Sequence, residues 1–136
     1  MARRFEILEH TADVGLRAWG ATLEELFASA TEAVAYIAGA WEPGTGEEIS
    51  IEVEAADREG LLVAWLSETL YLFDSRGGGL GGVGVASISR GSCRGWVTLR
   101  ELQDPDEGVQ VKAVTYHQLE VTEGSDGWMA TVYLDI

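Results

Sequence analysis

Hydrophobic and polar positions along the chain recur with a period of two in some segments and of three to four residues in others, which predicts both strands and helices. Residues 5–16 form a strand-like run that breaks into a polar turn and then resumes, with a second strand over residues 14–19. Alternation of period two recurs after each helix-like stretch, which predicts five further strands at residues 49–55, 85–90, 93–102, 109–122 and 128–136.

Two other segments have the three- and four-residue spacing of helices with one apolar face. The first begins at Thr22, which with Glu25 has the spacing of a capping box, and it ends at Gly39. The second is capped by Asp57 and is the more hydrophobic, so we expect it to lie against a sheet. The predicted buried side chains are Leu23, Leu26, Phe27, Ala30, Val34 and Ile37 in the first helix, and Leu61, Leu62, Trp65, Leu66, Thr69, Leu70 and Phe73 in the second.

Glycine-rich and turn-forming stretches separate these elements. Residues 74–84 contain six glycines in eleven positions, which predicts the end of the second helix followed by a flexible loop. The chain shows no repeat of 20 to 50 residues and no linker. We therefore predict one domain, residues 1–136, of the α+β class: a mostly antiparallel sheet with two amphipathic helices packed on one face.

Charge and composition exclude several functions. Twenty-three Asp and Glu against nine Lys and Arg give a net charge of −14, which repels nucleic-acid phosphates and attracts divalent cations or a basic protein partner. Neither a membrane span of roughly 20 apolar residues nor a signal peptide is apparent, so we expect a cytoplasmic protein that binds neither membranes nor nucleic acid directly. Cys93 is the only cysteine, which excludes an intramolecular disulfide and a thiolate zinc cluster.

Candidate metal ligands stand near the two ends of the sequence. Asp13 lies in the polar turn, and Asp135 precedes Ile136, whose main-chain carboxylate would be a third oxygen donor. Such donors suit Ca²⁺, Mg²⁺ or Mn²⁺ rather than zinc or copper, on condition that the two segments lie together. The alternative is that Asp13 bonds to its own turn and that Asp135 is an exposed carboxylate.

Sequence signatures of catalysis are lacking. His10 and His117 would have to supply any imidazole acid-base step, and neither has the spacing of a two-histidine metal motif. The chain has no nucleophile elbow, no P-loop and no dinucleotide fingerprint. Two alternatives stay open: a metal-dependent phosphoesterase using Asp13, Asp135 and His10, and a chaperone or interaction module presenting Trp19, Trp41 and Trp96.

The predicted strand over residues 109–122 carries further polar side chains. Strict alternation places Lys112, Val114 and Tyr116 on one face. The same rule places His117 and Val121 on the other face. Lys112 is then either a solvated cation or the partner of a carboxylate.

Four segments in order resemble the archease family: EHTADVG at residues 9–15, WLSETLYLFD at 65–74, VKAVTYH at 111–117 and VYLDI at 132–136. The resemblance spans almost the whole chain and implies an accessory protein, not an enzyme. Such a protein activates an RtcB-type RNA ligase in tRNA splicing and RNA repair, by promoting guanylylation of the ligase histidine and multiple turnover.

The resemblance also implies a set of site residues. A divalent cation, Ca²⁺ at rest with Mn²⁺ or Mg²⁺ as alternatives, is expected on Asp13, Asp135 and Ile136. Supporting roles or partner contacts are expected for the other polar residues that fall in or beside these motifs, namely His10, Glu68, Asp74, Lys112 and His117.

Overall fold

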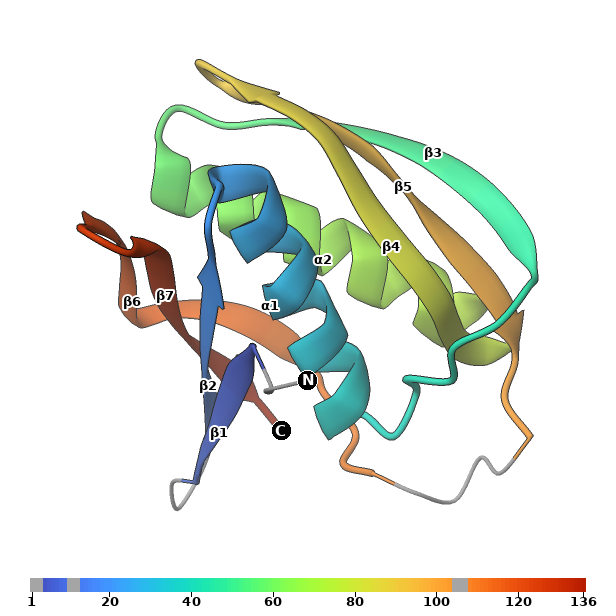
Figure 1. The fold of residues 1–136 in the computed structure, drawn as a ribbon. Coiled ribbons are helices and arrows are strands. Elements are labelled where there is room, and N and C mark those ends of the chain that lie inside the picture. The colour runs from blue at the N-terminus through green and yellow to red at the C-terminus, as the bar shows by residue number, and fades with distance from the viewer. Residues whose placement is uncertain (1–3, 10–12, 104–107) are drawn as a thin grey trace.

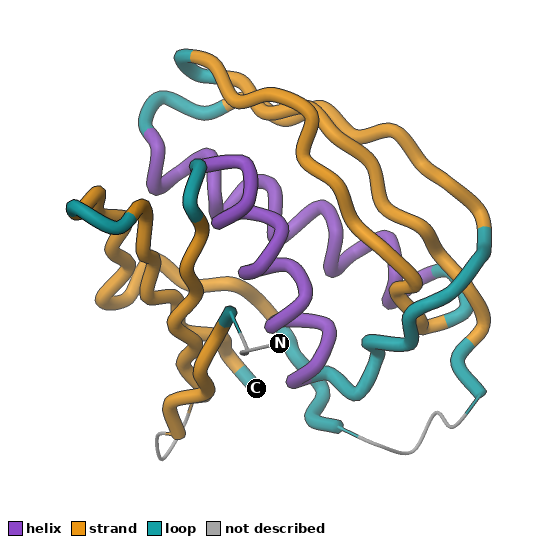
Figure 2. Tube along the Cα trace, in the orientation of Figure 1, coloured by secondary structure: helices purple, strands orange, loops and turns teal. Residues whose placement is uncertain are grey.

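Two helices and seven strands make up the part of the chain that the computed structural model describes, residues 4–9, 13–103 and 108–136 (Figure 2). The predicted α+β class is confirmed. Neither helix in these ranges is long and apolar enough to cross a bilayer. In chain order the elements are β1 (Phe5–Glu9), β2 (Asp13–Gly20), α1 (Leu23–Ile37), β3 (Glu47–Glu54), α2 (Arg58–Ser75), β4 (Gly78–Ser89), β5 (Ser92–Glu101), β6 (Ala113–Gly124) and β7 (Gly127–Asp135).

The strands form two antiparallel sheets, and both helices lie between them (Figure 1). One sheet has the order β1-β2-β7-β6 and the other the order β3-β5-β4. Each sheet has the helices on one face, as predicted, but the chain builds two sheets where we expected one. The division arises because β7 pairs with β2 instead of extending the β4–β5 hairpin, and alternation within a strand does not specify its partner.

Helix α1 begins with the predicted capping arrangement. The hydroxyl oxygen of Thr22 accepts the N–H of Glu25 at 3.1 Å. The Glu25 carboxylate accepts the N–H of Ala21 at 2.8 Å, so the return bond of the capping box is shifted by one residue. The helix ends at Ile37, and Gly39 follows at φ +70°, a conformation that glycine adopts without strain.

Helix α2 is enclosed more completely than a helix with a single apolar face. Asp57 caps it as predicted, because its Oδ1 accepts the N–H of Gly60 at 2.7 Å. All seven predicted buried residues are buried, and so are Val63 and Leu72. The additional burial follows from the contacts of α2 with β6 in one sheet and with β3, β4 and β5 in the other.

The glycine-rich segment is a strand, which corrects the predicted loop over residues 77–84. Strand β4 starts at Gly78 and pairs with β5 through to the turn at residues 90–91. A Cβ atom on Gly84 would overlap the indole ring of Trp96. Glycine in this strand therefore permits close packing by a neighbouring strand, and it does not indicate a flexible loop.

Strand β6 contains a wide bulge, which corrects the predicted alternation. Between the pairs made by Thr115 and Glu120, four residues of β6 stand opposite one residue of β7. Gln118 in the bulge has φ +52°. Because the bulge changes the alternation, Val114 and Val121 are both buried, although we predicted them on opposite faces.

Candidate functional site at the end of the four-stranded sheet

Asp13 and Asp135, two of the predicted metal ligands, lie directly opposite each other on neighbouring strands. Asp13 is the first residue of β2, Asp135 is the last of β7, and the two are register partners. Val14 and Leu134 beside them face the core, so both carboxylates lie on the outer face of the sheet. Opposed Cβ atoms are about 5 Å apart in such a pair, which lets both carboxylates reach one ion. We call these two residues the acidic pair.

Main-chain contacts fix the position of the acidic pair at the end of the sheet. The carbonyl oxygen of Asp135 accepts the N–H of Lys112 at 2.7 Å, and Ala113 is the register partner of Asp135 on β6. Asp135 is exposed, whereas Oδ1 of Asp13 is buried from solvent. Ile136 follows Asp135 directly and packs partly against the core. The pair thus combines a partly buried carboxylate with an exposed one on neighbouring strands.

Tyr133 and Gly15 lie next to the acidic pair on the same face. They are partners in the β2–β7 ladder, and a Cβ atom on Gly15 would approach a ring carbon of Tyr133 to 2.7 Å. His117, in the β6 bulge, places its ring edge-on to Tyr133, with centroids 5.9 Å apart and planes at 66°. The tyrosine ring therefore connects His117 to the face of the acidic pair. The sequence analysis assigned no role to Tyr133 or Gly15, although a glycine inside a strand indicates the close approach of another group.

Asp74 and Lys112 line a cavity of about 270 Å³ between α2 and β6, on the strand that pairs with Asp135. Asp74 is near the end of α2, and Lys112 directly precedes β6, so the predicted strand starts later than expected. No ion pair joins the two side chains among the residues described. The other lining residues are Ser67, Leu70, Tyr71, Val111, Ala113 and Val114.

The remaining predicted residues are placed differently. Glu68 is exposed on α2 and does not line this cavity. His10 lies outside the described residues. Within residues 4–9, 13–103 and 108–136, no three His, Cys, Asp or Glu side chains gather closely enough to hold a metal ion. A third donor beside the acidic pair would therefore have to come from elsewhere, and the main-chain oxygens of Ile136 are adjacent in sequence.

The fold and this site define a class of protein: a small α+β protein that presents paired carboxylates at the end of a sheet, with no recognisable nucleophile motif in its sequence. The model of the Archease protein family matches residues 5–136. The chain belongs to the archease family.

Relatives and solved structures agree with this assignment. The chain is 40% identical to the protein archease of Pyrococcus furiosus, over 98% of this chain and 99% of that protein. It is 36% identical to the protein archease of Methanosarcina barkeri, over 98% and 97%. The solution structure of Methanobacterium thermoautotrophicum protein 1598 aligns with a TM-score of 0.76 at 29% identity, over 99% of this chain and 100% of that chain.

A second solved structure supports the fold. The crystal structure of an archease from Thermotoga maritima, described as a possible chaperone, aligns with a TM-score of 0.69. It covers 95% of this chain and 94% of that chain. At 22% sequence identity this similarity bears on the architecture alone.

Proposed function

We propose that this protein activates an RtcB-type RNA ligase in the cytoplasm, promoting guanylylation of the ligase histidine and multiple turnover in tRNA splicing and RNA repair. Membership of the archease family supports the proposal. The observation that carries it is the register of β2 and β7, because it brings Asp13 and Asp135 together from opposite ends of the sequence. An acidic helper of this kind contributes no nucleophile, which the ligase supplies.

The donors present at the acidic pair fit a hard divalent cation. Asp13 and Asp135 offer carboxylate oxygens, and Ile136 offers main-chain oxygens, a set that suits Ca²⁺ at rest and also Mn²⁺ or Mg²⁺. When bound, such an ion neutralises charge on nucleotide phosphates and orients their oxygens. The β2–β7 ladder holds the main chain of the two aspartates opposite each other, so no backbone entropy need be lost to bring them together on binding.

The charge of the whole chain supports a basic protein partner. A net charge of −14 draws the protein towards a positively charged surface and repels RNA, so the helper would not compete for the ligase substrate. Tyr71 is 67% exposed at the rim of the cavity that Asp74 and Lys112 line. Ala113, the register partner of Asp135, also lines this cavity, and we expect the ligase to contact the cavity rim first.

The test compares Asp13→Asn and Asp135→Asn with the matched control Asp126→Asn. Asn keeps the side-chain shape and removes the charge. Asp126 is exposed in the turn before β7, about 30 Å along the strand from Asp135. Ligase guanylylation over several turnovers is measured, and calcium binding to each variant without ligase is measured by calorimetry. We expect both site variants to lose stimulation and calcium binding together, and the control to keep both.

Equal stimulation of the ligase by the parent protein and all three variants would contradict the assignment of Asp13 and Asp135 to the site.

A second candidate function, binding of unfolded clients, is favoured by the indole rings of Trp19 and Trp96, which are 37% and 39% exposed. The description of the Thermotoga maritima archease as a possible chaperone agrees with it. Suppression of aggregation of unrelated proteins, unaffected by Asp13→Asn, would support this function instead.

A further inference from the structure

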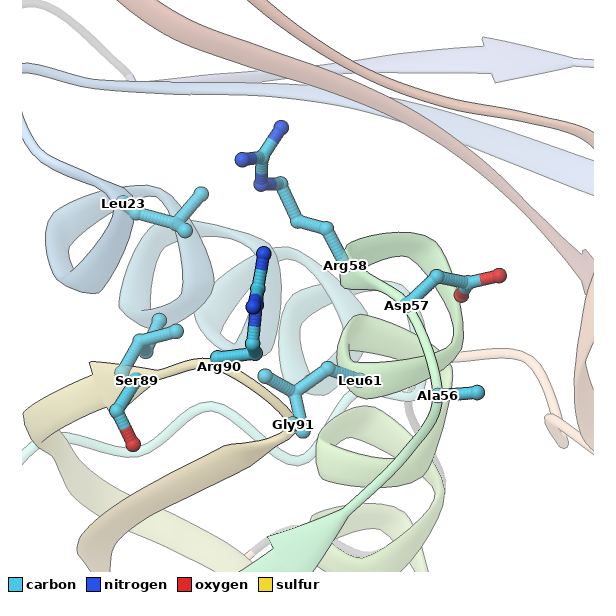
Figure 3. A pocket seen from close by; sticks show the side chains of 9 residues that line it. Leu23, Ala56, Asp57, Arg58, Leu61, Ser89, Arg90 and Gly91 are labelled. Atoms are coloured by element: carbon cyan, nitrogen blue, oxygen red, sulfur yellow. The ribbon is translucent and has the colours of Figure 1, made fainter.

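A second cavity, of about 410 Å³, opens where the starts of both helices meet the turn between β4 and β5 (Figure 3). Arg58 stacks on Trp128 at the start of β7, so this cavity is about 23 Å along the strand from Asp135. It is therefore separate from the acidic pair. Its lining residues are Leu23, Ala56, Asp57, Arg58, Leu61, Ile88, Ser89, Arg90 and Gly91.

Two arginines of this cavity form no ion pair with any carboxylate in the described part of the chain. Eight Lys and Arg side chains fall within the described ranges, and half of them pair with a carboxylate: Arg4, Arg17, Arg76 and Arg100. Arg58 and Arg90 do not, although acidic residues outnumber basic ones 23 to 9. In Figure 3 both side chains extend toward the same side.

An aromatic ring holds the Arg58 side chain, and the turn between β4 and β5 fixes the main chain at Arg90. The Arg58 guanidinium lies over the ring of Trp128, 4.7 Å from its centroid. Arg90 lies in the two-residue turn between β4 and β5, where Gly91 has φ +79° and its carbonyl oxygen accepts the N–H of Ala55 at 3.1 Å. The stacked guanidinium of Arg58 therefore loses less entropy on binding an anion than a freely rotating side chain does.

Nearby carboxylates are engaged elsewhere. Asp57 accepts the N–H of Gly60 at 2.7 Å, and in Figure 3 its carboxylate points away from the two guanidinium groups. Glu24 of α1 accepts the main-chain N–H of Ile88 at 3.2 Å. The cavity is thus lined by two arginines and one aspartate, and neither arginine forms an ion pair with a described carboxylate.

We propose that this cavity binds a small molecule that carries a phosphate group on an apolar or aromatic body. Guanidinium groups form paired hydrogen bonds with phosphate oxygens, and two of them match its double negative charge. The apolar side chains of Leu23, Leu61 and Ile88 line the same cavity and would cover the body of the ligand. The volume exceeds that of a phosphate ion, so a phosphate alone leaves much of the cavity unfilled.

The test uses phenyl phosphate as the probe, with inorganic phosphate and phenol as its two separate halves. Binding to the full chain is measured by calorimetry and by amide shifts at Arg90 and Gly91 in NMR spectra. We expect phenyl phosphate to bind more tightly than either half. We expect Arg90→Gln and Arg58→Gln each to weaken it about tenfold or more, the usual effect of losing a hydrogen-bonded charge contact.

Arg94→Gln is the matched control. Arg94 also forms no ion pair among the described residues, but it lines a different surface, over β3 and β5, so its loss changes net charge without changing this cavity. Circular dichroism verifies that each variant folds, and Arg58→Lys retains the charge while changing the stack on Trp128. No binding of phenyl phosphate, or equal weakening by Arg90→Gln and Arg94→Gln, would overturn the proposal.

Discussion

The buried hydrogen bond between the two helices gives a prediction whose size follows from the structure. Thr31 on α1 and Trp65 on α2 are both fully buried, and the indole Nε1–H of Trp65 donates to the Thr31 hydroxyl oxygen at 2.9 Å. That hydroxyl donates in turn to the carbonyl oxygen of Phe27 at 2.7 Å. Thr31→Val keeps the shape of the side chain but removes the acceptor, so the indole N–H stays buried without a partner.

The expected cost is the desolvation penalty of that indole N–H. An unsatisfied buried donor costs about 1–3 kcal/mol, so we expect the free energy of unfolding to fall by about 2 kcal/mol. Thr69→Val is the matched control, because Thr69 is equally buried on α2 and its hydroxyl donates to the carbonyl oxygen of Leu66 at 3.0 Å. That substitution removes one donor from a helix carbonyl and leaves no buried N–H without an acceptor. The free energy of unfolding should therefore fall by less than about 1 kcal/mol.

Urea unfolding followed by far-ultraviolet circular dichroism measures both variants. The dependence of unfolding free energy on urea should match that of the parent protein, because neither change alters the area exposed on unfolding. A loss for Thr31→Val no larger than that for Thr69→Val would contradict the role assigned to the Trp65–Thr31 hydrogen bond. It would mean that the indole N–H finds another acceptor or water between the helices.

Two further predictions concern titrating groups. Burial, with a smaller contribution from Glu24, raises the pKa of the fully buried Cys93 thiol to about 12, so a disulfide reagent at pH 8 should label it only as the protein unfolds. Labelling of the native protein as fast as in urea would contradict this. Burial raises the pKa of Glu32 above its ordinary 4.5, and the charge of Arg4 partly opposes this shift. Folding therefore disfavours the ionised carboxylate, so the free energy of unfolding should fall as pH rises from about 4.5 through the raised pKa. Glu32→Gln should therefore stabilise the protein at pH 7 relative to pH 3, and an equal effect at both would refute it.

Local sequence patterns predicted most of the elements and their ends. The caps Thr22 and Asp57 and the stop at Gly39 depend on neighbouring residues in the chain, and all three occur where the sequence placed them. The predicted loop over the glycine-rich segment and the predicted alternation along β6 were wrong for the same reason. In both, the conformation is set by a partner strand: the indole of Trp96 in the case of Gly84, and the ladder with β7 in the case of Gln118.

The candidate site divides in the same way. The sequence supplied the donors at Asp13 and Asp135 and the family motifs around them, because residue type alone decides that these donors are hard oxygens. Local sequence patterns could not predict that Asp13 and Asp135 lie together, because this requires β7 to pair with β2, more than a hundred residues away in the chain. The contact of Tyr133 with His117 was also out of reach, because a bulge directs His117 to that ring.

The class of fold, the helix ends, the acidic charge and the oxygen donors can all be read from the chain, because each depends on residue type or short-range spacing. Three features follow from the folded arrangement instead: the strands form two sheets around the helices, two aspartates face each other, and Arg58 and Arg90 share a cavity. These features depend on which distant segments pair, and that choice is made by the packing of the whole chain.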